Sequence, residues 1–189
     1  PGGEPSFVIF GENDRGQFSG GHVPGNRTPM TVSDFMWPSN FQDGEHVLRI
    51  VGGIEAQHVV MLTTRGRAYA WGNNTAGQLG RQCGGSQPEV NACEDVPGLE
   101  RCHTEPKLVY GGGTGPTSEP LTRIQLAALG STHSCFVRMN ERNQQQVECM
   151  SRYARPFGQQ GPDDDLSCDW KIIDRLPRNL HWVQLEAAE

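Results

Sequence analysis

The chain has 189 residues, enough for a single domain, and carries 16 Lys and Arg against 22 Asp and Glu, for a net charge of −6. Binding to nucleic acid through phosphate groups needs the opposite balance, and the sequence has no basic run. No stretch approaches the roughly 18 consecutive apolar residues that cross a bilayer. We therefore expect neither a nucleic-acid partner nor a membrane span.

In chain order, the first feature is a glycine-punctuated motif that returns later. Four residue types recur in the same spacing, 61 residues apart: Gly11, Asn13, Gly16 and Gln17, then Gly72, Asn74, Gly77 and Gln78.

The second copy follows the clearest hairpin in the sequence. Val59–Leu62 and Ala68–Trp71 are short apolar runs separated by Arg65-Gly66-Arg67, which predicts two antiparallel strands with glycine in the turn. A strand that is apolar on both faces has to be covered on both faces. We expect Gly72, Gly77 and Gly80 to supply positive φ or close backbone approach in the corner that follows, and Asn74 to bond its own backbone there.

A third, degenerate copy runs from His133 to Gly158 and Gly161, displaced by 75 residues from the copy that opens at His58. It has Met150-Ser151 where the second copy has Trp71-Gly72. Self-similarity at a long period is typical of repeat architectures. We expect His58 and His133, at the repeat position, to be structural hydrogen-bonding residues.

The residues of the second copy resemble a known repeat. A His that opens an apolar strand, a glycine turn, an aromatic strand ending in Trp71-Gly72, and then Asn74-x-x-Gly77-Gln78-Leu-Gly80 are similar to the regulator of chromosome condensation repeat. The resemblance implies an all-β fold, a segment of a seven-bladed β-propeller. At about 60 residues per blade the chain would supply about three blades, and closed propellers have about 4 to 8. We therefore expect a segment of a larger propeller.

This interpretation divides the chain into seven parts. They are a partial blade at 1–20, a connector at 21–44, the best-preserved repeat at 45–80, a Cys-, Gly- and Pro-rich loop insertion at 81–120, a degenerate repeat at 121–161, a linker at 162–180 and the first strand of a further blade at 181–189. Long loops are usually functional or disordered, so the insertion is the predicted partner surface, and little of it should be needed to build a blade.

Six cysteines form the second informative feature. Cys135 and Cys149 lie in the two hairpin strands of the third repeat, and extracytoplasmic members of the family resemble this chain in placing a cysteine pair there. Facing positions on antiparallel strands are close to the distance that a disulfide needs. We predict that these two form a disulfide; two reduced, buried thiols are the alternative.

The other cysteines are Cys83, Cys93 and Cys102 in the insertion and Cys168 in the linker. Zinc ligands usually come in close pairs, and these separations are 10 and 9 residues, so we expect disulfides and no metal or other cofactor. Their connectivity is left open.

Two glycosylation sequons begin at Asn26 and Asn73, and they are meaningful only in the secretory pathway. Together with the cysteines they favour an extracellular or lumenal protein; a cytoplasmic location is the alternative.

No hydrolase, metalloprotease or dinucleotide-binding motif occurs, so we expect no enzyme. The predicted function is a protein-interaction scaffold or a structural component of a larger assembly. The alternative, implied by the resemblance, is a guanine-nucleotide exchange factor for a small GTPase, as the founding family member is.

Overall fold

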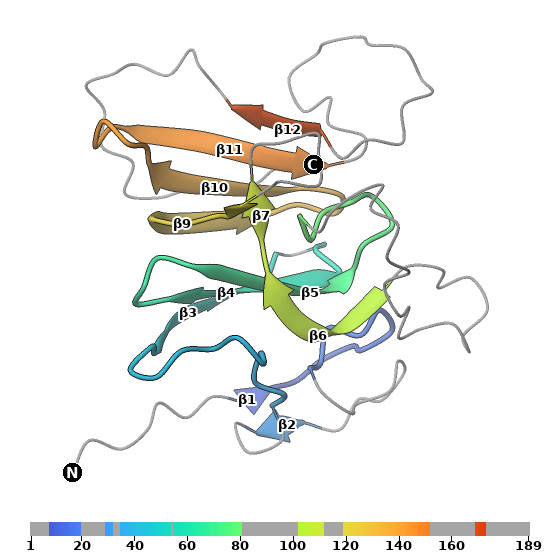
Figure 1. Ribbon diagram of the computed structural model, residues 1–189. Coiled ribbons are helices and arrows are strands. Elements are labelled where there is room, and N and C mark those ends of the chain that lie inside the picture. Colours follow the sequence, from blue (N-terminus) through green and yellow to red (C-terminus); the bar gives the residue numbers. More distant parts are fainter. Residues whose placement is uncertain are drawn as a thin grey trace, which may run out of the picture.

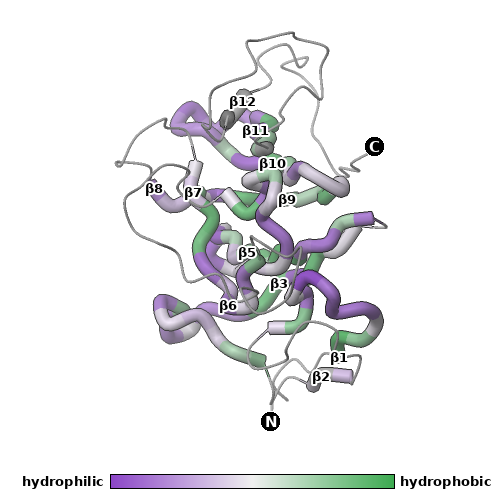
Figure 2. Tube along the Cα trace, turned by 90° about the vertical axis from the view of Figure 1, so that its right-hand side faces the viewer, coloured by the Kyte–Doolittle hydropathy of each residue, from purple (hydrophilic) through white to green (hydrophobic). Residues whose placement is uncertain are grey.

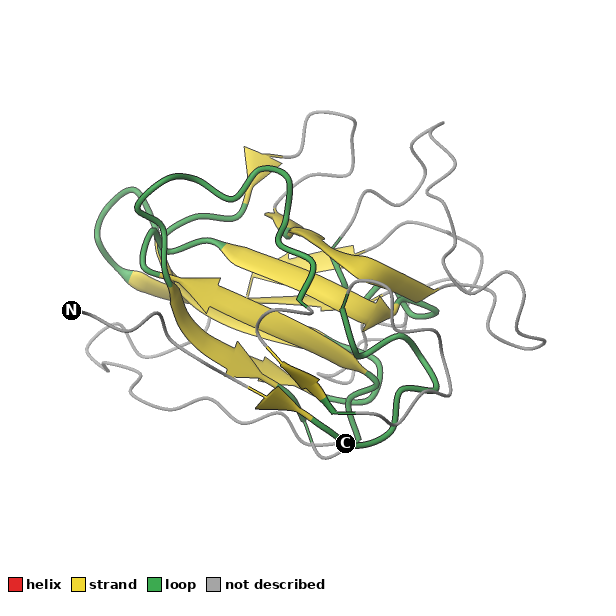
Figure 3. Cartoon of the chain, turned by 90° about the horizontal axis from the view of Figure 1, so that it is seen from below, coloured by secondary structure: helices red, strands yellow, loops and turns green. Residues whose placement is uncertain are grey.

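The computed structural model describes residues 8–19, 29–31, 35–53, 55–80, 102–111, 119–151 and 169–172. All regular structure in these ranges is β-strand (Figure 3), so the predicted all-β fold is confirmed for them. The strands are β1 (Val8–Ile9), β2 (Met30–Thr31), β3 (Val47–Val51), β4 (His58–Thr63), β5 (Ala68–Asn73), β6 (Cys102–Leu108), β7 (Tyr110–Gly111), β8 (Glu119–Pro120), β9 (Ile124–Leu129), β10 (Ser134–Met139), β11 (Gln145–Ser151) and β12 (Asp169–Ile172). Within the described ranges, no helix is long and apolar enough to cross a membrane.

Two four-stranded antiparallel sheets dominate the structure. One has the order β3-β4-β5-β6 and the other the order β12-β11-β10-β9, so each is a meander of strands that are consecutive in the chain. The two sheets are stacked, with β1 and β2 pairing on the far side of the first (Figure 1). Four-stranded meanders stacked in this way are the blades of a propeller.

The two central hairpins close with the same turn. In the first, the Thr63 amide donates to the Arg67 carbonyl at 3.1 Å, and Gly66 has a φ of 68°. In the second, Asn143 takes the place of Gly66 with a φ of 56°. Asparagine is among the few residues that tolerate this left-handed conformation, so the turn survives the loss of glycine.

Both sheets also carry a bulge at the same place. The pairing register shifts between Val47 and Arg49 in the first sheet and between Val137 and Arg138 in the second. A bulge leaves one residue out of the ladder. In the first sheet this residue is Leu48, whose side chain is exposed.

The main core lies between the two sheets and consists of small and aliphatic side chains from both. Its buried members are Val60, Leu62, Ala68, Ala70, Leu79, Val109, Leu121, Ile124, Ala127, Leu129, Phe136 and Met150. A second, aromatic core lies on the opposite face of the first sheet and includes Phe18, Phe35, Met61, Tyr69, Trp71 and Leu108. Figure 2 shows hydrophobic residues in the stacked strands and hydrophilic residues in the turn between β10 and β11.

The predicted boundaries need correction outside the hairpins. The segment 81–120 is not simply a loop, because it contains β7, β8 and the whole of β6, the fourth strand of the first sheet. The expected linker contains β12, and the expected connector contains β2. The strand at β6 was missed because its sequence lacks alternation and includes Pro106, which edge strands and bulges tolerate. Residues 181–189 lie outside the described part of the chain.

Candidate functional site: blade junctions and the surfaces they leave exposed

The repeated asparagines hold the blade corners as predicted. Asn74 Oδ1 accepts a hydrogen bond from the Leu79 amide at 3.1 Å, and Asn13 Oδ1 accepts one from the Phe18 amide at 2.8 Å. Each bond joins two residues that are five positions apart in the chain. The motif that returns after 61 residues therefore repeats in its hydrogen bonding as well as in its sequence.

The repeated glutamines do the same. Gln78 Oε1 accepts from the Ala76 amide and Gln17 Oε1 from the Arg15 amide, each at 2.8 Å. Each side-chain oxygen thus bonds inside its own corner, and Gln78 Nε2 also donates to the Ser131 carbonyl at 3.5 Å, so both residues are structural.

Glycine is required in the corner for two different reasons. Gly72 has a φ of 103°, and a Cβ there would lie 2.7 Å from His58 Cα. At Gly80 a Cβ would lie 2.5 Å from Met150 Sδ, in the second sheet. Positive φ values are shared by the other corner glycines that the sequence singled out: Gly11, Gly16 and Gly77.

His58 joins the two blades. Its Nε2 lies 2.7 Å from Ser134 Oγ, and Ser134 Oγ donates to the Gln78 carbonyl at 2.8 Å. Because the single hydroxyl proton of Ser134 goes to Gln78, His58 has to donate through Nε2–H. The predicted structural role of His58 is therefore accounted for by a contact between sheets.

This assignment leaves His58 Nδ1 as a buried acceptor with no hydrogen-bond partner. A protonated ring would be buried as a charge, which is costly. Burial, with a smaller contribution from repulsion by His133, lowers the pKa of His58 to about 3. His58 is thus neutral at physiological pH.

His133, the equivalent residue of the third repeat, is only half-buried. Burial lowers its pKa as well. Its ring lies against Gly130, where any side chain would collide with it. The other residues singled out in that repeat, Gly158 and Gly161, lie outside the described residues.

The predicted disulfide is confirmed. Cys135 and Cys149 face each other across β10 and β11, with their Cα atoms 4.1 Å apart and their sulfur atoms 2.04 Å apart. They pack with Val137, Val147 and Leu126 on the face of the second sheet that is turned away from the main core.

Cys102 is also disulfide-bonded, so its thiolate is not a metal ligand. Within the described residues no group of three or more His, Cys, Asp or Glu side chains is placed to hold a metal ion. Cys83, Cys93 and Cys168 lie outside the described residues.

The structure opposes one of the two predicted glycosylation sites. Asn73 is buried, its Nδ2 donates to Gln57 Oε1 at 3.0 Å, and its Oδ1 accepts from the Thr75 amide at 3.0 Å. A glycan on Nδ2 would have to displace the first of these bonds and open the corner. The second candidate, Asn26, lies outside the described residues.

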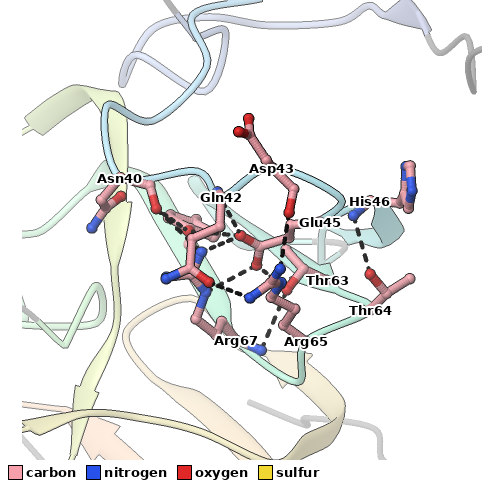
Figure 4. Close-up of polar contacts among 10 residues, drawn as sticks. Asn40, Gln42, Asp43, Glu45, His46, Thr63, Thr64, Arg65 and Arg67 are labelled. Carbon is pink, nitrogen blue, oxygen red and sulfur yellow. Dashed lines mark hydrogen bonds and ion pairs between the residues drawn. The ribbon is translucent and has the colours of Figure 1, made fainter.

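A polar cluster that the sequence did not predict ties the loop before β3 to the first hairpin (Figure 4). The buried Glu45 carboxylate accepts from Thr63 Oγ1 at 2.5 Å and from Arg67 Nε at 3.0 Å. Its second oxygen pairs with Arg67 NH2 and accepts from the Gln42 amide at 3.1 Å. Thr63 and Arg67 lie 18 and 22 residues from Glu45 in the chain, so no local pattern could have indicated these two contacts.

The electrostatics of this cluster follow from burial and pairing. Burial alone would raise the pKa of Glu45, but the hydrogen bonds from Arg67, Thr63 and Gln42 outweigh it and lower the pKa. The same pair raises the pKa of Arg67. Burial, followed by the Glu45 charge, raises the pKa of Tyr69 to about 12. The cluster is a fixed structural ion pair with no group poised to exchange protons near neutral pH.

The second blade has its own buried ion pair at the corresponding end. Glu148 is buried, and its Oε1 accepts from Arg138 Nε at 2.6 Å and from Gln146 Nε2. In this second ion pair the carboxylate thus comes from β11, whereas in the first blade it comes from Glu45 in the loop before β3. Each blade neutralises one arginine internally.

One exposed apolar surface lies at the N-terminal end of the stack. Val8 is 56% exposed and Phe10 is 78% exposed. By the 61-residue repeat they correspond to Tyr69 and Trp71, which are completely buried. Met36 and Trp37, in the loop after β2, are exposed as well.

The same comparison extends to the second sheet. Glu148 and Met150 occupy the positions of Tyr69 and Trp71 in β11, and both are buried against the preceding layer. The β1–β2 pair, the β3–β6 sheet and the β9–β12 sheet thus form three successive layers. In each layer, alternate residues along one strand point toward the N-terminal end of the stack. Among the described layers, the first alone has these residues, Val8 and Phe10, uncovered.

One family model matches the central part of the chain. Residues 65–137 match the regulator of chromosome condensation (RCC1) repeat. No curated protein sequence matches the chain. Among solved structures, human WBSCR16 is similar with a TM-score of 0.46 and 18% identity over 75% of this chain, which spans 28% of that one. Residues 65–137 thus carry an RCC1 repeat, consistent with a member of that repeat family, and the all-β fold of antiparallel sheets in the described residues fits a segment of a β-propeller.

Proposed function

We propose that this chain is a non-enzymatic β-propeller module that acts as a protein-interaction scaffold or a structural component of a larger assembly. The observation that carries the proposal is the exposed surface at Val8 and Phe10, whose equivalents in the following layers are buried. Exposed large apolar side chains at positions that are buried in the other repeats are typical of an interaction surface.

The repeat also indicates what would cover this surface. Tyr69 and Trp71 share a core cluster with Phe18 and Phe35 of the N-terminal segment, and Met150 shares one with aliphatic residues of the first sheet. The partner of Val8 and Phe10 is therefore an apolar β-sheet face, like that of another blade, from the same or another polypeptide.

The proposal includes an oxidising compartment, extracellular or lumenal. It is supported by the Cys135–Cys149 disulfide and by the bonded state of Cys102, since cytosolic thiols are normally kept reduced. Glycosylation at Asn26 is part of this proposal.

The experiment is photo-crosslinking from position 10 in the protein purified with its native associates. Phe10 is replaced by a photoreactive phenylalanine analogue, and Leu48, which is 63% exposed, receives the same group as a matched control. We expect position 10 to link to an apolar β-strand and position 48 not to do so. Equal yields from the two positions, or no product from position 10, would reject the surface as an interface.

A separate assay distinguishes the exchange-factor alternative. Purified chain is added to small GTPases loaded with labelled nucleotide, and nucleotide release is followed. The scaffold proposal expects the intrinsic release rate; a clear acceleration would favour the alternative.

A further inference from the structure

A second surface, independent of the one at Phe10, lies along the hairpin turns of the two blades. The turns lie one above the other at the left of Figure 1. They are joined by the segment that enters β9, because the Ile124 amide donates to the Gly66 carbonyl at 2.9 Å. A Cβ on Gly66 would lie 3.0 Å from Arg123 Cα, so Arg123 is directly beside the first turn.

Three exposed arginines follow this edge. Arg65 and Arg142 hold the same position in the two turns, each directly before the residue of positive φ, Gly66 or Asn143. Arg123 lies between the turns. We call Arg65, Arg123 and Arg142 the arginine edge.

Two of the three guanidinium groups are held in place by neutral oxygens. Arg65 donates from NH1 to Gln42 Oε1 at 2.6 Å and from NH2 to the Asp43 carbonyl at 2.9 Å. Figure 4 shows the carboxylate of Asp43 directed away from this contact. The carbonyl oxygens orient the group without compensating its charge.

Arg123 is oriented in the same way. It donates from NH1 to the Asn140 carbonyl at 2.8 Å and from NH2 to Asn143 Oδ1. A guanidinium has five N–H donors, so Arg65 and Arg123 each retain three. The side chain of Arg142 makes no hydrogen bond or ion pair within the described residues.

The arginines next to these turns differ from the arginine edge because they have carboxylate partners. Arg67 and Arg138, next to the same turns, are each paired with a buried carboxylate, Glu45 or Glu148. The arginine edge has no such partner in the described part of the chain, although the exposed carboxylates of Asp43 and Glu141 lie on the same loops. In a chain of net charge −6, three exposed arginines without an ion-pair partner among the described residues stand out at this edge.

We propose that the arginine edge binds an acidic segment of a protein partner, with Asp or Glu carboxylates taking the free donors of Arg65, Arg123 and Arg142. Guanidinium groups match carboxylates in planar geometry and charge. Groups that are already held in position lose less conformational freedom on binding. A short acidic segment fits better than a nucleic acid, because the net charge of −6 repels a long polyanion.

The test uses a fluorescent ten-residue polyglutamate peptide, with a polyglutamine peptide of equal length as neutral control. Binding is measured by anisotropy at low salt for the wild type and for Arg65→Gln/Arg142→Gln. The charge-matched control is Arg49→Gln/Lys107→Gln, which changes two other exposed cations. We expect the edge variant to bind polyglutamate at least tenfold more weakly and the control to stay within twofold of the wild type.

Equal losses in the two variants, or no loss in the edge variant, would overturn the proposal. Tighter binding of a ten-base-pair DNA duplex than of polyglutamate would also overturn it, in favour of nucleic acid. If the double variant does not fold, Arg142→Gln serves alone, because the Arg142 side chain makes no hydrogen bond or ion pair with the described residues. It should weaken polyglutamate binding about threefold, and an unchanged affinity would contradict the proposal. None of these results depends on crosslinking at position 10.

Discussion

His58 illustrates how a single residue makes a blade junction sensitive to acid. Its pKa is about 3 in the folded chain and about 6.5 when unfolded, so the unfolded state takes up a proton first as the pH falls. The junction is fully stable above pH ~6.5 and loses stability between there and pH 3, by at most about 1.4 kcal/mol per pH unit.

We predict that His58→Gln removes much of this dependence, because glutamine keeps an N–H donor for Ser134 and does not titrate. Urea unfolding at pH 7.5, 6 and 4.5 measures it, with exposed His46→Gln as control. The wild type should lose stability on acidification relative to His58→Gln, whereas His46→Gln should follow the wild type. If the free energy of unfolding falls equally with pH in all three proteins, His58 does not cause the loss of stability in acid.

Trp71 is the largest completely buried side chain among the described residues. Its Nε1 donates to the Gln17 carbonyl at 2.7 Å, and its ring lies edge-on to Phe35, with centroids 5.5 Å apart. We predict that Trp71→Ala lowers the free energy of unfolding by about 3 to 5 kcal/mol, through the cavity and the lost hydrogen bond.

Denaturant unfolding checks this value against Trp37→Ala. Trp37 is 41% exposed, so its truncation should cost clearly less. Equal effects at the two tryptophans would show that Trp71 does not lie in a packed interface between layers.

At the scale of elements, the β10–β11 hairpin differs from the β4–β5 hairpin because it contains the bonded pair Cys135 and Cys149. Cys135 and Cys149 occupy the positions that Val60 and Ala70 hold in the first sheet, where ordinary packing suffices. The disulfide closes a loop of sequence separation 14, for which the chain-entropy model gives about 3 kcal/mol.

We predict that Cys135→Val/Cys149→Ala, which copies the first sheet, is less stable than the oxidised wild type by about 3 kcal/mol. It should be close in stability to the wild type after reduction of this bond. Thermal unfolding under the two redox conditions provides the comparison. A variant as stable as the oxidised protein would show that the bond adds nothing to hairpin packing.

Because the segment 81–120 contains strand β6, it is needed to complete the first sheet, contrary to the expectation that little of it builds a blade. Replacing residues 83–117 by a short turn would remove β6, which pairs along β5 from Tyr69 to Asn73. We therefore predict loss of cooperative unfolding, since the edge of β5 and the buried Leu108 would be exposed. The control replaces residues 84–92 only and keeps β6 and all the cysteines; it should unfold cooperatively. Cooperative unfolding of the longer deletion would show that β6 is dispensable.

For the whole molecule, the sequence predicted those features that repeat. The hairpins, corner asparagines and corner glycines were predictable because each depends on a few residues at fixed spacing. Strands β6 and β12 were not, since Pro106 and the absence of alternation hide the first, and four residues, Asp169–Ile172, are too few to reveal the second.

The surfaces were the least predictable. Glu45 and Arg67 meet through tertiary contact, and the exposure of Phe10 follows from what lies next to it, so neither has a local signal. The arginine edge likewise became visible only when the two turns were placed side by side, since Arg65 and Arg142 are distant in sequence.

In the described part of the chain, successive layers present equivalent residues to the layer before them, and those of the first layer alone are uncovered. Hydroxyl-radical footprinting of the native chain, read by mass spectrometry at Phe10, Trp71 and Met150, tests it most directly. We expect Phe10 to be oxidised nearly as fast as in the unfolded chain, whereas Trp71 and Met150 should be strongly protected despite their high intrinsic reactivity. Protection of Phe10, or oxidation of Trp71 and Met150 at unfolded rates, would contradict it.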